Sequence, residues 1–109
     1  MERLFVYASL APGRPNAHVL GELEGFWEMG TVTGSLRLEG WGAEMGYPGI
    51  DLDEYGDEIP GFLFSSEQLS DYWTKLDEFE GKAYQRVLTV VKLPDNRTVD
   101  AYIYALGET

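Results

Sequence analysis

Apolar residues recur every three or four positions between residues 69 and 79, and this spacing predicts an amphipathic helix. Upstream, Ser65 and Gln68 form a capping-box pattern that is typical of a helix start. Gly81 stands where helices commonly end in a left-handed residue. The predicted buried stripe consists of Leu69, Tyr72, Trp73, Leu76 and Phe79.

Glu80 falls within this apolar stripe. At about 100° per residue it points within roughly 20° of Leu69, whereas Asp77 and Glu78 point toward the flank and back of the helix. A carboxylate there is unfavourable twice, because burial removes water from the ionised form and raises its pKa, and because the last helical turn carries the negative end of the macrodipole. Local conflicts of this kind occur mostly where function requires them. Glu80 is therefore a candidate functional acid.

Shorter runs predict strands, separated by glycine, proline and acidic turns. The run Leu4–Tyr7 is continuously apolar, as in a strand that is covered on both faces. Alternation with glycines from 25 to 39 indicates two strands with a bend or bulge between them. The other predicted elements are paired strands at 50–53 and 61–64 around a turn at 55–57, a hairpin of strands 84–93 and 98–106 joined by residues 94–97, and a short helix capped by Asn16. In the last strand, Tyr102 and Tyr104 line one face, and Val99, Ala101, Ile103 and Ala105 share the other.

The order of predicted elements is a strand, a short helix, several strands, one long helix and a final hairpin. With many strands and few helices, the economical arrangement is an α+β fold in which a small, curved or barrel-like mixed sheet packs against a helix. A chain of 109 residues is expected to form one domain, here residues 1–109, around one modest core.

Composition narrows the function classes. The chain has no cysteine, which excludes disulfides, thiolate nucleophiles and cysteine-ligated zinc. Its net charge of -11 argues against nucleic acid or an anionic membrane as partner, since both attract basic surfaces. Pro12 ends the first apolar run too early for a secretory leader, and no run approaches a membrane span. We expect a soluble, cytoplasmic protein; the oligomeric state stays open.

Several groups of residues look like metal or catalytic sites but have simpler structural explanations. Residues 51–56 begin like a calcium loop, but Tyr55 and Phe62 occupy ligand positions, so a solvated turn is the better account. His18 is the only histidine, which makes a histidine-based metal site unfavourable. A nucleophilic pair of Ser9 and His18 lacks the Gly-x-Ser-x-Gly elbow. Surface ion pairs are the ordinary role of scattered arginines.

Glu80 itself has a structural alternative. It could form an ion pair with Lys82 or Arg86, or turn to water at a fraying helix end. The functional interpretation combines Glu80 with the turn after the first strand. Backbone N–H groups of that turn can bind an anion, and the hydroxyl of Ser9 could add a donor. A carboxyl of raised pKa beside it would suit acid–base chemistry on a small substrate that carries a carboxylate.

Three ordered blocks resemble the γ-glutamylcyclotransferase-like (AIG2-like) family over nearly the whole chain. The blocks are Phe5-Val6-Tyr7-Ala8-Ser9-Leu10 with Pro12-Gly13-Arg14-Pro15-Asn16, then Tyr47-Pro48-Gly49, then Leu76-Asp77-Glu78-Phe79-Glu80-Gly81 with Tyr84-Gln85-Arg86. The resemblance implies a small mixed β-barrel flanked by helices, with Glu80 at the position of the catalytic glutamate. It also implies that the substrate-binding residues are Tyr7, Ala8, Ser9, Leu10, Tyr47 and Tyr84, and that no metal or organic cofactor is needed.

The implied reaction cleaves a γ-glutamyl amide. The substrate's α-carboxylate would bind the turn at residues 7–10, and Glu80 would take a proton from the α-amine, which attacks the γ-carbonyl of the same molecule. The products are 5-oxoproline and a free amine or amino acid. The chain departs from the family at Ala8, where glycine is usual and would permit positive φ or close ligand approach. A non-catalytic small-molecule-binding module on the same barrel is therefore the alternative. A protein–protein adaptor is a third reading, favoured if no enclosed pocket lies beside Glu80.

Overall fold

Six strands, one 3₁₀ helix and one α-helix make up the described part of the chain in the computed structural model. The structure describes residues 2–7, 21, 23–37, 49–80 and 84–106, apart from the side chains of Arg37 and Glu80. The predicted helix at Asn16 and the predicted helix end at Gly81 lie outside these residues. Neither described helix has the length and apolar character needed to cross a membrane. The elements are β1 (Glu2–Val6), β2 (Phe26–Arg37), β3 (Gly49–Leu52), β4 (Asp57–Ser66), the 3₁₀ helix η2 (Glu67–Asp71), α2 (Trp73–Glu80), β5 (Tyr84–Lys92) and β6 (Thr98–Leu106).

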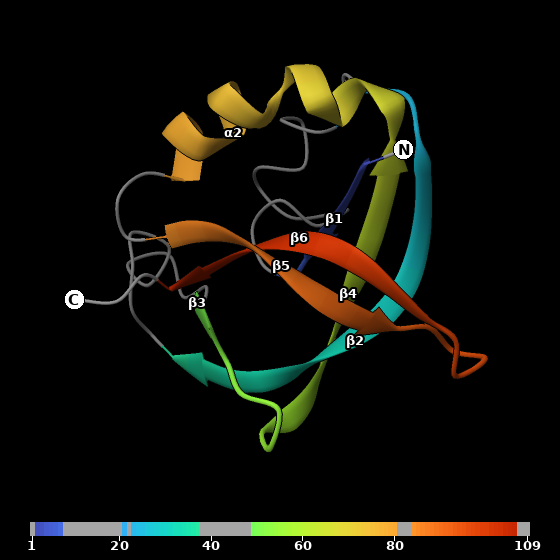
Figure 1. The fold of residues 1–109 in the computed structure, drawn as a ribbon, viewed down its shortest axis with the longest axis vertical. Coiled ribbons are helices and arrows are strands. Elements are labelled where there is room, and N and C mark those ends of the chain that lie inside the picture. The colour runs from blue at the N-terminus through green and yellow to red at the C-terminus, as the bar shows by residue number, and fades with distance from the viewer. Residues whose placement is uncertain (1, 8–20, 22, 38–48, 81–83, 107–109) are drawn as a thin grey trace.

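Five of the strands close into a barrel. The sheet order is β3-β2-β4-β1-β6-β5, and a further pairing between Thr31 of β2 and Lys92 of β5 closes it. β1 runs antiparallel to β4 and parallel to β6, so the barrel is mixed. β3 is the extra strand beside β2, and η2 and α2 lie across one side of the barrel (Figure 1). The predicted α+β class with a small mixed barrel is confirmed.

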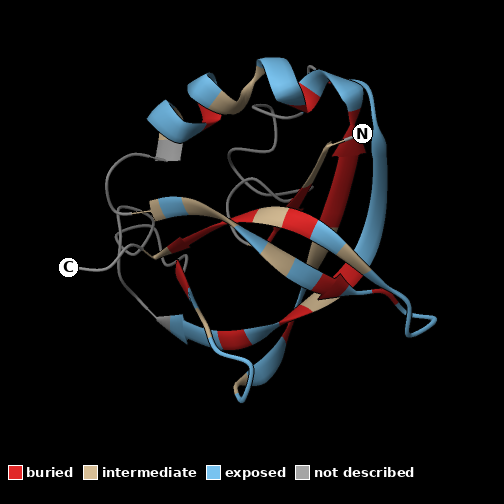
Figure 2. Cartoon of the chain, in the orientation of Figure 1, coloured by how far each residue is buried: buried red, intermediate tan, exposed pale blue. Residues whose placement is uncertain are grey.

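Two apolar clusters lie on the two sides of the barrel wall. The inner cluster fills the barrel, and the outer cluster lies between the wall and the two helices. Strand β1 contributes to both, because Phe5 belongs to the inner cluster and Leu4 and Val6 to the outer one. The prediction that this strand is covered on both faces is confirmed (Figure 2). The inner cluster comprises Phe5, Val32, Ile50, Ile59, Leu63, Val91, Leu93, Ala101, Ile103 and Ala105, and the outer cluster comprises Leu4, Val6, Leu23, Phe64, Leu69, Leu76 and Tyr104.

β2 differs from its prediction. Residues 25–39 were expected to hold two strands, but β2 is one strand of 12 residues. It pairs with β4 from Phe26 to Gly34 and with β3 from Gly34 to Arg37. The predicted pairing of strands 50–53 and 61–64 is therefore wrong, since both strands pair with β2 instead. The turn between them packs on β2 itself, where a Cβ on Gly56 would lie 2.6 Å from the Gly34 carbonyl oxygen.

The final hairpin is confirmed. β5 and β6 pair from Tyr84 opposite Leu106 to Lys92 opposite Thr98. Asn96 adopts φ 69° in the turn, a left-handed conformation that asparagine tolerates well. Across this sheet the predicted division of faces also holds. Ala101, Ile103 and Ala105 lie in the inner cluster with Val99 packed against it, and Tyr102 and Tyr104 lie at the outer one.

The helical segment begins later than predicted and is divided in two. Ser65 still belongs to β4, and the cap is Ser66, whose hydroxyl accepts from the Gln68 N–H at 3.1 Å. The Gln68 side chain does not close a capping box, because its oxygen accepts from the Glu24 N–H at 2.7 Å. The predicted stripe is nevertheless confirmed in the described side chains. Leu69 and Leu76 are fully buried, while Tyr72, Trp73 and Phe79 are half-buried against the outer cluster.

Candidate functional site

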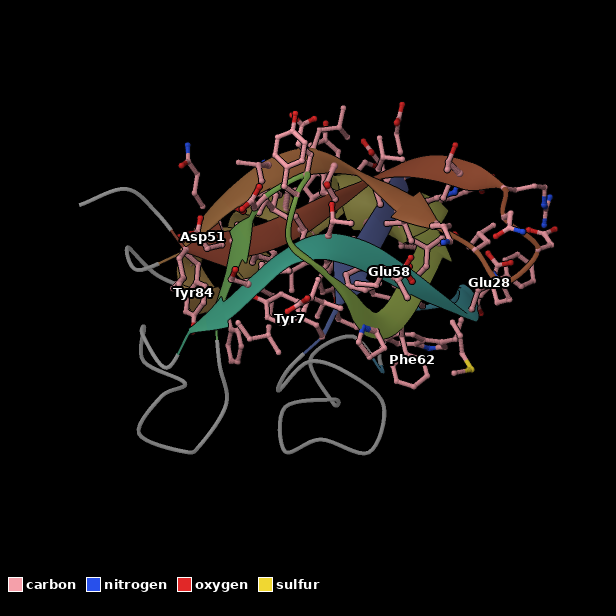
Figure 3. The ribbon with its side chains drawn as sticks, turned by 90° about the horizontal axis from the view of Figure 1, so that it is seen from below. Tyr7, Glu28, Asp51, Glu58, Phe62 and Tyr84 are labelled. Carbon is pink, nitrogen blue, oxygen red and sulfur yellow. The ribbon has the colours of Figure 1, made fainter. Side chains whose placement is uncertain are left out.

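The predicted site residues fall at the end of β1, the end of α2 and the start of β5. Tyr7 directly follows β1, Glu80 is the last residue of α2, and Tyr84 is the first residue of β5. In Figure 3, Tyr7 lies near the middle of the barrel and Tyr84 near the edge where β5 begins. Four of the predicted residues lie outside the described residues, as does the side chain of Glu80: they are Ala8, Ser9, Leu10 and Tyr47.

The hydroxyl of Tyr7 bonds to the main chain of two other strands. It donates to the Tyr104 carbonyl oxygen at 2.8 Å and accepts from the Ile50 N–H at 2.9 Å. The bonds join the end of β1 to β6 and to β3. They fix the residue from which the predicted substrate-binding turn departs. Direct contact between Tyr7 and a substrate stays a prediction.

Tyr84 starts β5 four positions after Glu80. Its side chain is half-buried and packs against the outer cluster, which also contains the residues of α2 that face the barrel. Opposite it on β6 is Leu106. The structure therefore sets Tyr84 on the same side of the barrel wall as α2, and its role in substrate binding stays a prediction.

Asp77 is exposed, as the sequence predicts, and its carboxylate is also bonded to two residues of the final hairpin. Its carboxylate accepts from the Tyr104 hydroxyl at 2.6 Å and from Arg86 Nε at 3.0 Å and Nη2 at 3.4 Å. The Arg86 guanidinium also lies 4.5 Å from the centre of the Trp73 ring. Arg86 was one suggested partner for Glu80, and the structure pairs it with Asp77 instead. Asp77 and Glu80 are three positions apart, so the bonded carboxylate lies one helical turn before the candidate acid.

Sequence reasoning missed this network because its parts are distant along the chain. Asp77 belongs to α2, Arg86 to β5 and Tyr104 to β6. The available signals were the pairing of Arg86 with Tyr104 in a hairpin that the sequence does predict, and the acidic residue one turn before Glu80. Neither signal shows that the helix crosses that part of the hairpin.

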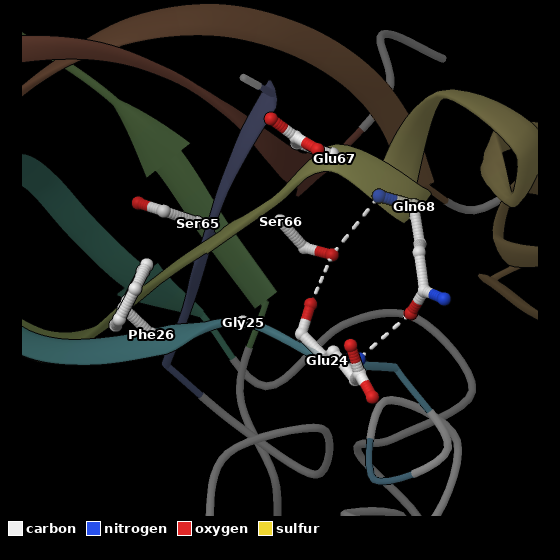
Figure 4. Close-up of a pocket in the computed structure, with 7 residues that line it drawn as sticks. All are labelled: Glu24, Gly25, Phe26, Ser65, Ser66, Glu67 and Gln68. Carbon is white, nitrogen blue, oxygen red and sulfur yellow. Dashed lines mark hydrogen bonds between the residues drawn. The ribbon is translucent and has the colours of Figure 1, made fainter.

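A surface hollow of about 460 Å³ opens at the other end of the helical segment, between the start of β2, the end of β4 and η2 (Figure 4). The polar groups of Ser66 and Gln68 are used within the protein, because Ser66 donates to the Glu24 carbonyl oxygen and Gln68 accepts from the Glu24 N–H. Tyr7 and Tyr84, the two predicted site residues whose side chains the structure describes, do not line this hollow, and the predicted pocket beside Glu80 stays a prediction. The lining residues are Glu24, Gly25, Phe26, Ser65, Ser66, Glu67 and Gln68.

The calcium-like segment forms a turn between β3 and β4. The Asp53 carboxylate accepts from the Tyr55 N–H at 2.9 Å, which is a bond within the turn. Across the described ranges, no group of three or more histidine or acidic side chains could hold a metal ion. Ser9 and His18, the other discounted pair, lie outside the described residues.

Solved structures with the same fold come from several kingdoms. YkqA from Bacillus subtilis is 26% identical with a TM-score of 0.73, and the match covers 99% of this chain but 36% of YkqA. This chain thus spans just over a third of that protein's length. An AIG2-like protein from Mus musculus is 25% identical with a TM-score of 0.72, covering 98% of this chain and 78% of the mouse protein. A protein from Arabidopsis thaliana, 20% identical with a TM-score of 0.70 over 96% of this chain and 61% of its own, shares the fold.

The comparison of sequences leads to the same group. No curated protein matches this chain at a significant level. The family model described as gamma-glutamyl cyclotransferase, AIG2-like, matches residues 4–109, which is nearly the entire chain. The chain belongs to the gamma-glutamyl cyclotransferase, AIG2-like family.

Proposed function

We propose that this protein is a γ-glutamylcyclotransferase-type enzyme. It cleaves a γ-glutamyl amide by intramolecular attack of the α-amine, and it releases 5-oxoproline and a free amine or amino acid. Glu80 is the acid and base, the turn that follows Tyr7 binds the substrate carboxylate, and the protein acts in the cytoplasm without an added cofactor. Family membership supports the reaction class, and the local geometry supports these roles.

The observation that carries the proposal is the junction at Tyr104. The main chain of Tyr104 accepts the bond from Tyr7, and its side chain donates to Asp77 on the helix that ends in Glu80. The two segments that the reaction needs, a carboxylate-binding turn and a carboxyl acid, thus depart from points tied to one residue. Catalysis by positioning requires such a fixed relation between the groups that hold and attack the substrate.

The chemistry then follows from one proton transfer in each direction. The α-amino nitrogen bonds to the γ-carbonyl carbon and gives a proton to the Glu80 carboxylate. The resulting carboxylic acid gives that proton to the departing nitrogen as the amide C–N bond breaks. The five-membered ring closes within one molecule, so restraint of the substrate's conformation contributes much of the rate. From the sequence, burial is expected to raise the pKa of Glu80, and a carboxyl with a raised pKa is suited to both transfers.

The test is turnover of a panel of γ-glutamyl amines and γ-glutamyl dipeptides, with 5-oxoproline as the measured product. The wild type is expected to turn over at least one compound, and Glu80→Gln is expected to abolish turnover while the protein stays folded. Glu78→Gln is the matched control, since it removes the same charge from an exposed position on the same helix. It is expected to retain activity.

Two results would contradict the proposal that this protein is a γ-glutamylcyclotransferase. Equal turnover by wild type and Glu80→Gln would remove Glu80 from the mechanism. Saturable binding of a γ-glutamyl compound without 5-oxoproline would favour the alternative of a binding module. The substitution Ala8→Gly restores the glycine that is usual in the family. If the Ala8 methyl narrows the carboxylate site, this variant should have higher turnover or affinity than the wild type. It thus distinguishes weak activity caused by the Ala8 methyl from a loss of the activity itself.

A further inference from the structure

Tyr104 takes no part in the proposed proton transfers, but its side chain bonds to the helix that carries Glu80. Its side chain is 5% exposed and lies in the outer cluster, beneath the helical segment. The hydroxyl donates to Asp77 Oδ1 at 2.6 Å. Hydrogen bonds to an ionised carboxylate are about twice as strong as neutral ones. α2 is thereby held to β6 at a point one turn before Glu80.

Arg86 completes the attachment from the neighbouring strand. It lies opposite Tyr104 in the β5–β6 pairing and contacts both oxygens of Asp77. Its guanidinium lies 4.5 Å from the Trp73 ring centre and 5.2 Å from that of Tyr102. Trp73 and Asp77 are one turn apart on α2, so the hairpin holds the helix at two points. Rotation of α2 about its axis would break both contacts. A helix of 8 residues depends on such tertiary contacts, because short helices are marginal by themselves.

The main chain of Tyr104 is bonded in the opposite direction. Its carbonyl oxygen accepts from the Tyr7 hydroxyl at 2.8 Å, and Tyr7 in turn accepts from the Ile50 N–H at 2.9 Å. Tyr7 is the residue immediately before Ala8, where the predicted substrate turn begins. Tyr104 is therefore bonded by its side chain to the helix that carries Glu80, and by its backbone to Tyr7, the residue before the predicted turn.

We propose that Tyr104 is a positioning residue, which through its hydroxyl bond to Asp77 sets the end of α2, and with it Glu80, relative to the turn that follows Tyr7. This inference rests on the proposed function for its catalytic consequence. The structural coupling between β6 and the end of α2 is testable without it. Removing the hydroxyl leaves the Tyr104 carbonyl and the Tyr7 bond in place, so the helix end moves while the turn does not.

The first test is the kinetics of Tyr104→Phe on the best γ-glutamyl substrate. We expect kcat to fall between about 10- and 100-fold, the loss expected when a reacting group is misplaced by about 1 Å. KM should stay close to the wild-type value, because the carboxylate-binding turn keeps its support from Tyr7. A rise in KM with unchanged kcat would overturn the proposal, and so would wild-type values of both.

Tyr102→Phe is the matched control. Tyr102 lies two positions away on the same strand and the same face, and its ring packs against Trp73 at 5.2 Å between centroids. Among the described residues its hydroxyl makes no hydrogen bond, whereas that of Tyr104 does. The substitution therefore removes an equivalent atom without touching Asp77. We expect kcat and KM of Tyr102→Phe to match the wild type, and an equal loss in both variants would contradict the proposal.

The second test does not use activity. Amide hydrogen exchange should become faster at residues 76–80 of Tyr104→Phe while the strands of the barrel keep their protection. A merely structural role of Tyr104 would weaken both together. If the wild type turns over no γ-glutamyl compound, the proposed function fails, and this exchange pattern still decides whether Tyr104 sets the helix end. Unchanged exchange at residues 76–80 would overturn the coupling.

A pair of variants on the helix side guards against a misfolded Tyr104→Phe. Asp77→Ala removes the same bond, and Asp77→Asn keeps an oxygen that can accept from Tyr104. The expected order of kcat is wild type, then Asp77→Asn, then Asp77→Ala, with similar KM. If Asp77→Asn is as impaired as Asp77→Ala, the effect comes from losing the ion pair between Asp77 and Arg86. That result would contradict a role for the tyrosine hydroxyl.

Discussion

Gly30 and Gly61 lie directly opposite each other in the ladder between β2 and β4, and the ring of Phe5 lies against them. A Cβ at Gly61 would lie 2.6 Å from Phe5 Cζ, and a Cβ at Gly30 would lie 3.8 Å from Phe5 Cε2 and 2.7 Å from Val91 Cγ1. Phe5 is 1% exposed and belongs to the inner cluster. The two glycines thus make room for a large side chain inside a narrow barrel.

Gly61→Ala is expected to destabilise the protein by about 1–3 kcal/mol, the usual cost of overpacking a core. The added methyl would lie 2.6 Å from the Val6 carbonyl oxygen, which as a main-chain atom cannot rotate away. Urea unfolding measures the change. Gly21→Ala is the control, because no atom of the described residues lies within 4 Å of its Cβ position. An unfolding midpoint for Gly61→Ala equal to that of the wild type would show that β1 and β4 separate without cost.

Tyr7→Phe is expected to lower the free energy of unfolding by about 1 kcal/mol, since it removes two hydrogen bonds to the main chain. The Ile50 N–H and the Tyr104 carbonyl oxygen each lose their bond to the Tyr7 hydroxyl. In the proposed enzyme KM should also rise, because the residue that precedes the substrate-binding turn is no longer held by these bonds. Denaturant unfolding and steady-state kinetics measure the two effects. Tyr55→Phe is the control, as Tyr55 is 89% exposed, and a loss of equal size there would contradict the assignment.

Asp95 in the turn between β5 and β6 is expected to contribute to the pH dependence of stability. The Arg97 backbone N–H, followed by its guanidinium, holds the pKa of this carboxyl below its usual value of 3.8. The folded state therefore binds this proton less tightly than the unfolded state does. The stabilisation is present above the unfolded pKa and is lost as the pH falls below about 4.

Urea unfolding of Asp95→Asn across an acidic pH series checks this expectation. The variant should be slightly less stable than the wild type near neutral pH, and the difference should shrink as the pH falls. Asp100→Asn, at an exposed position of β6, is the comparison. A constant difference between Asp95→Asn and the wild type at all pH values would show that the carboxylate charge has no part in the turn.

Local patterns predicted the elements well because each pattern lies within one segment. The strand predicted from the apolar run Leu4–Tyr7 forms as β1 (Glu2–Val6), and the stripe through Leu69 and Leu76 and the final hairpin also form as expected. In each of these, burial and turn chemistry act within the segment itself. The sequence alone therefore supports the fold class.

Partner choice between segments was predicted less well. The glycines at 30 and 34 indicated a bend, but they are close-approach positions in one long strand that serves β4 and β3 in turn. Alternation shows which face of a strand is buried and not which strand lies beside it. For the same reason, the bonds of Asp77 to Arg86 and Tyr104 depend on where the helix crosses the hairpin, which no local spacing encodes.

Glu80→Gln is expected to leave the melting temperature near neutral pH unchanged or to raise it. Position 80 follows Leu76 by one helical turn, and Leu76 is fully buried. The sequence predicts that the Glu80 side chain continues this stripe, where burial and the helix dipole both disfavour a charge, so we expect a neutral amide of the same shape to be favoured. Removal of a desolvated, poorly compensated charge is often neutral or stabilising. Thermal unfolding of both proteins measures the difference.

Asp77→Asn, on the same helix, is expected to lower the stability of the protein. Its carboxylate is engaged by Arg86 and Tyr104, so the amide should lower stability, by under about 1 kcal/mol because the pair is partly exposed. The contrast separates two roles for acids one turn apart. If Glu80→Gln lowered the melting temperature as much as Asp77→Asn or more, Glu80 would be a structural ion-pair partner, and its proton would not be available for the proposed reaction. A stable Glu80→Gln protein without turnover would instead mean that the fold tolerates this acid for the sake of its chemistry.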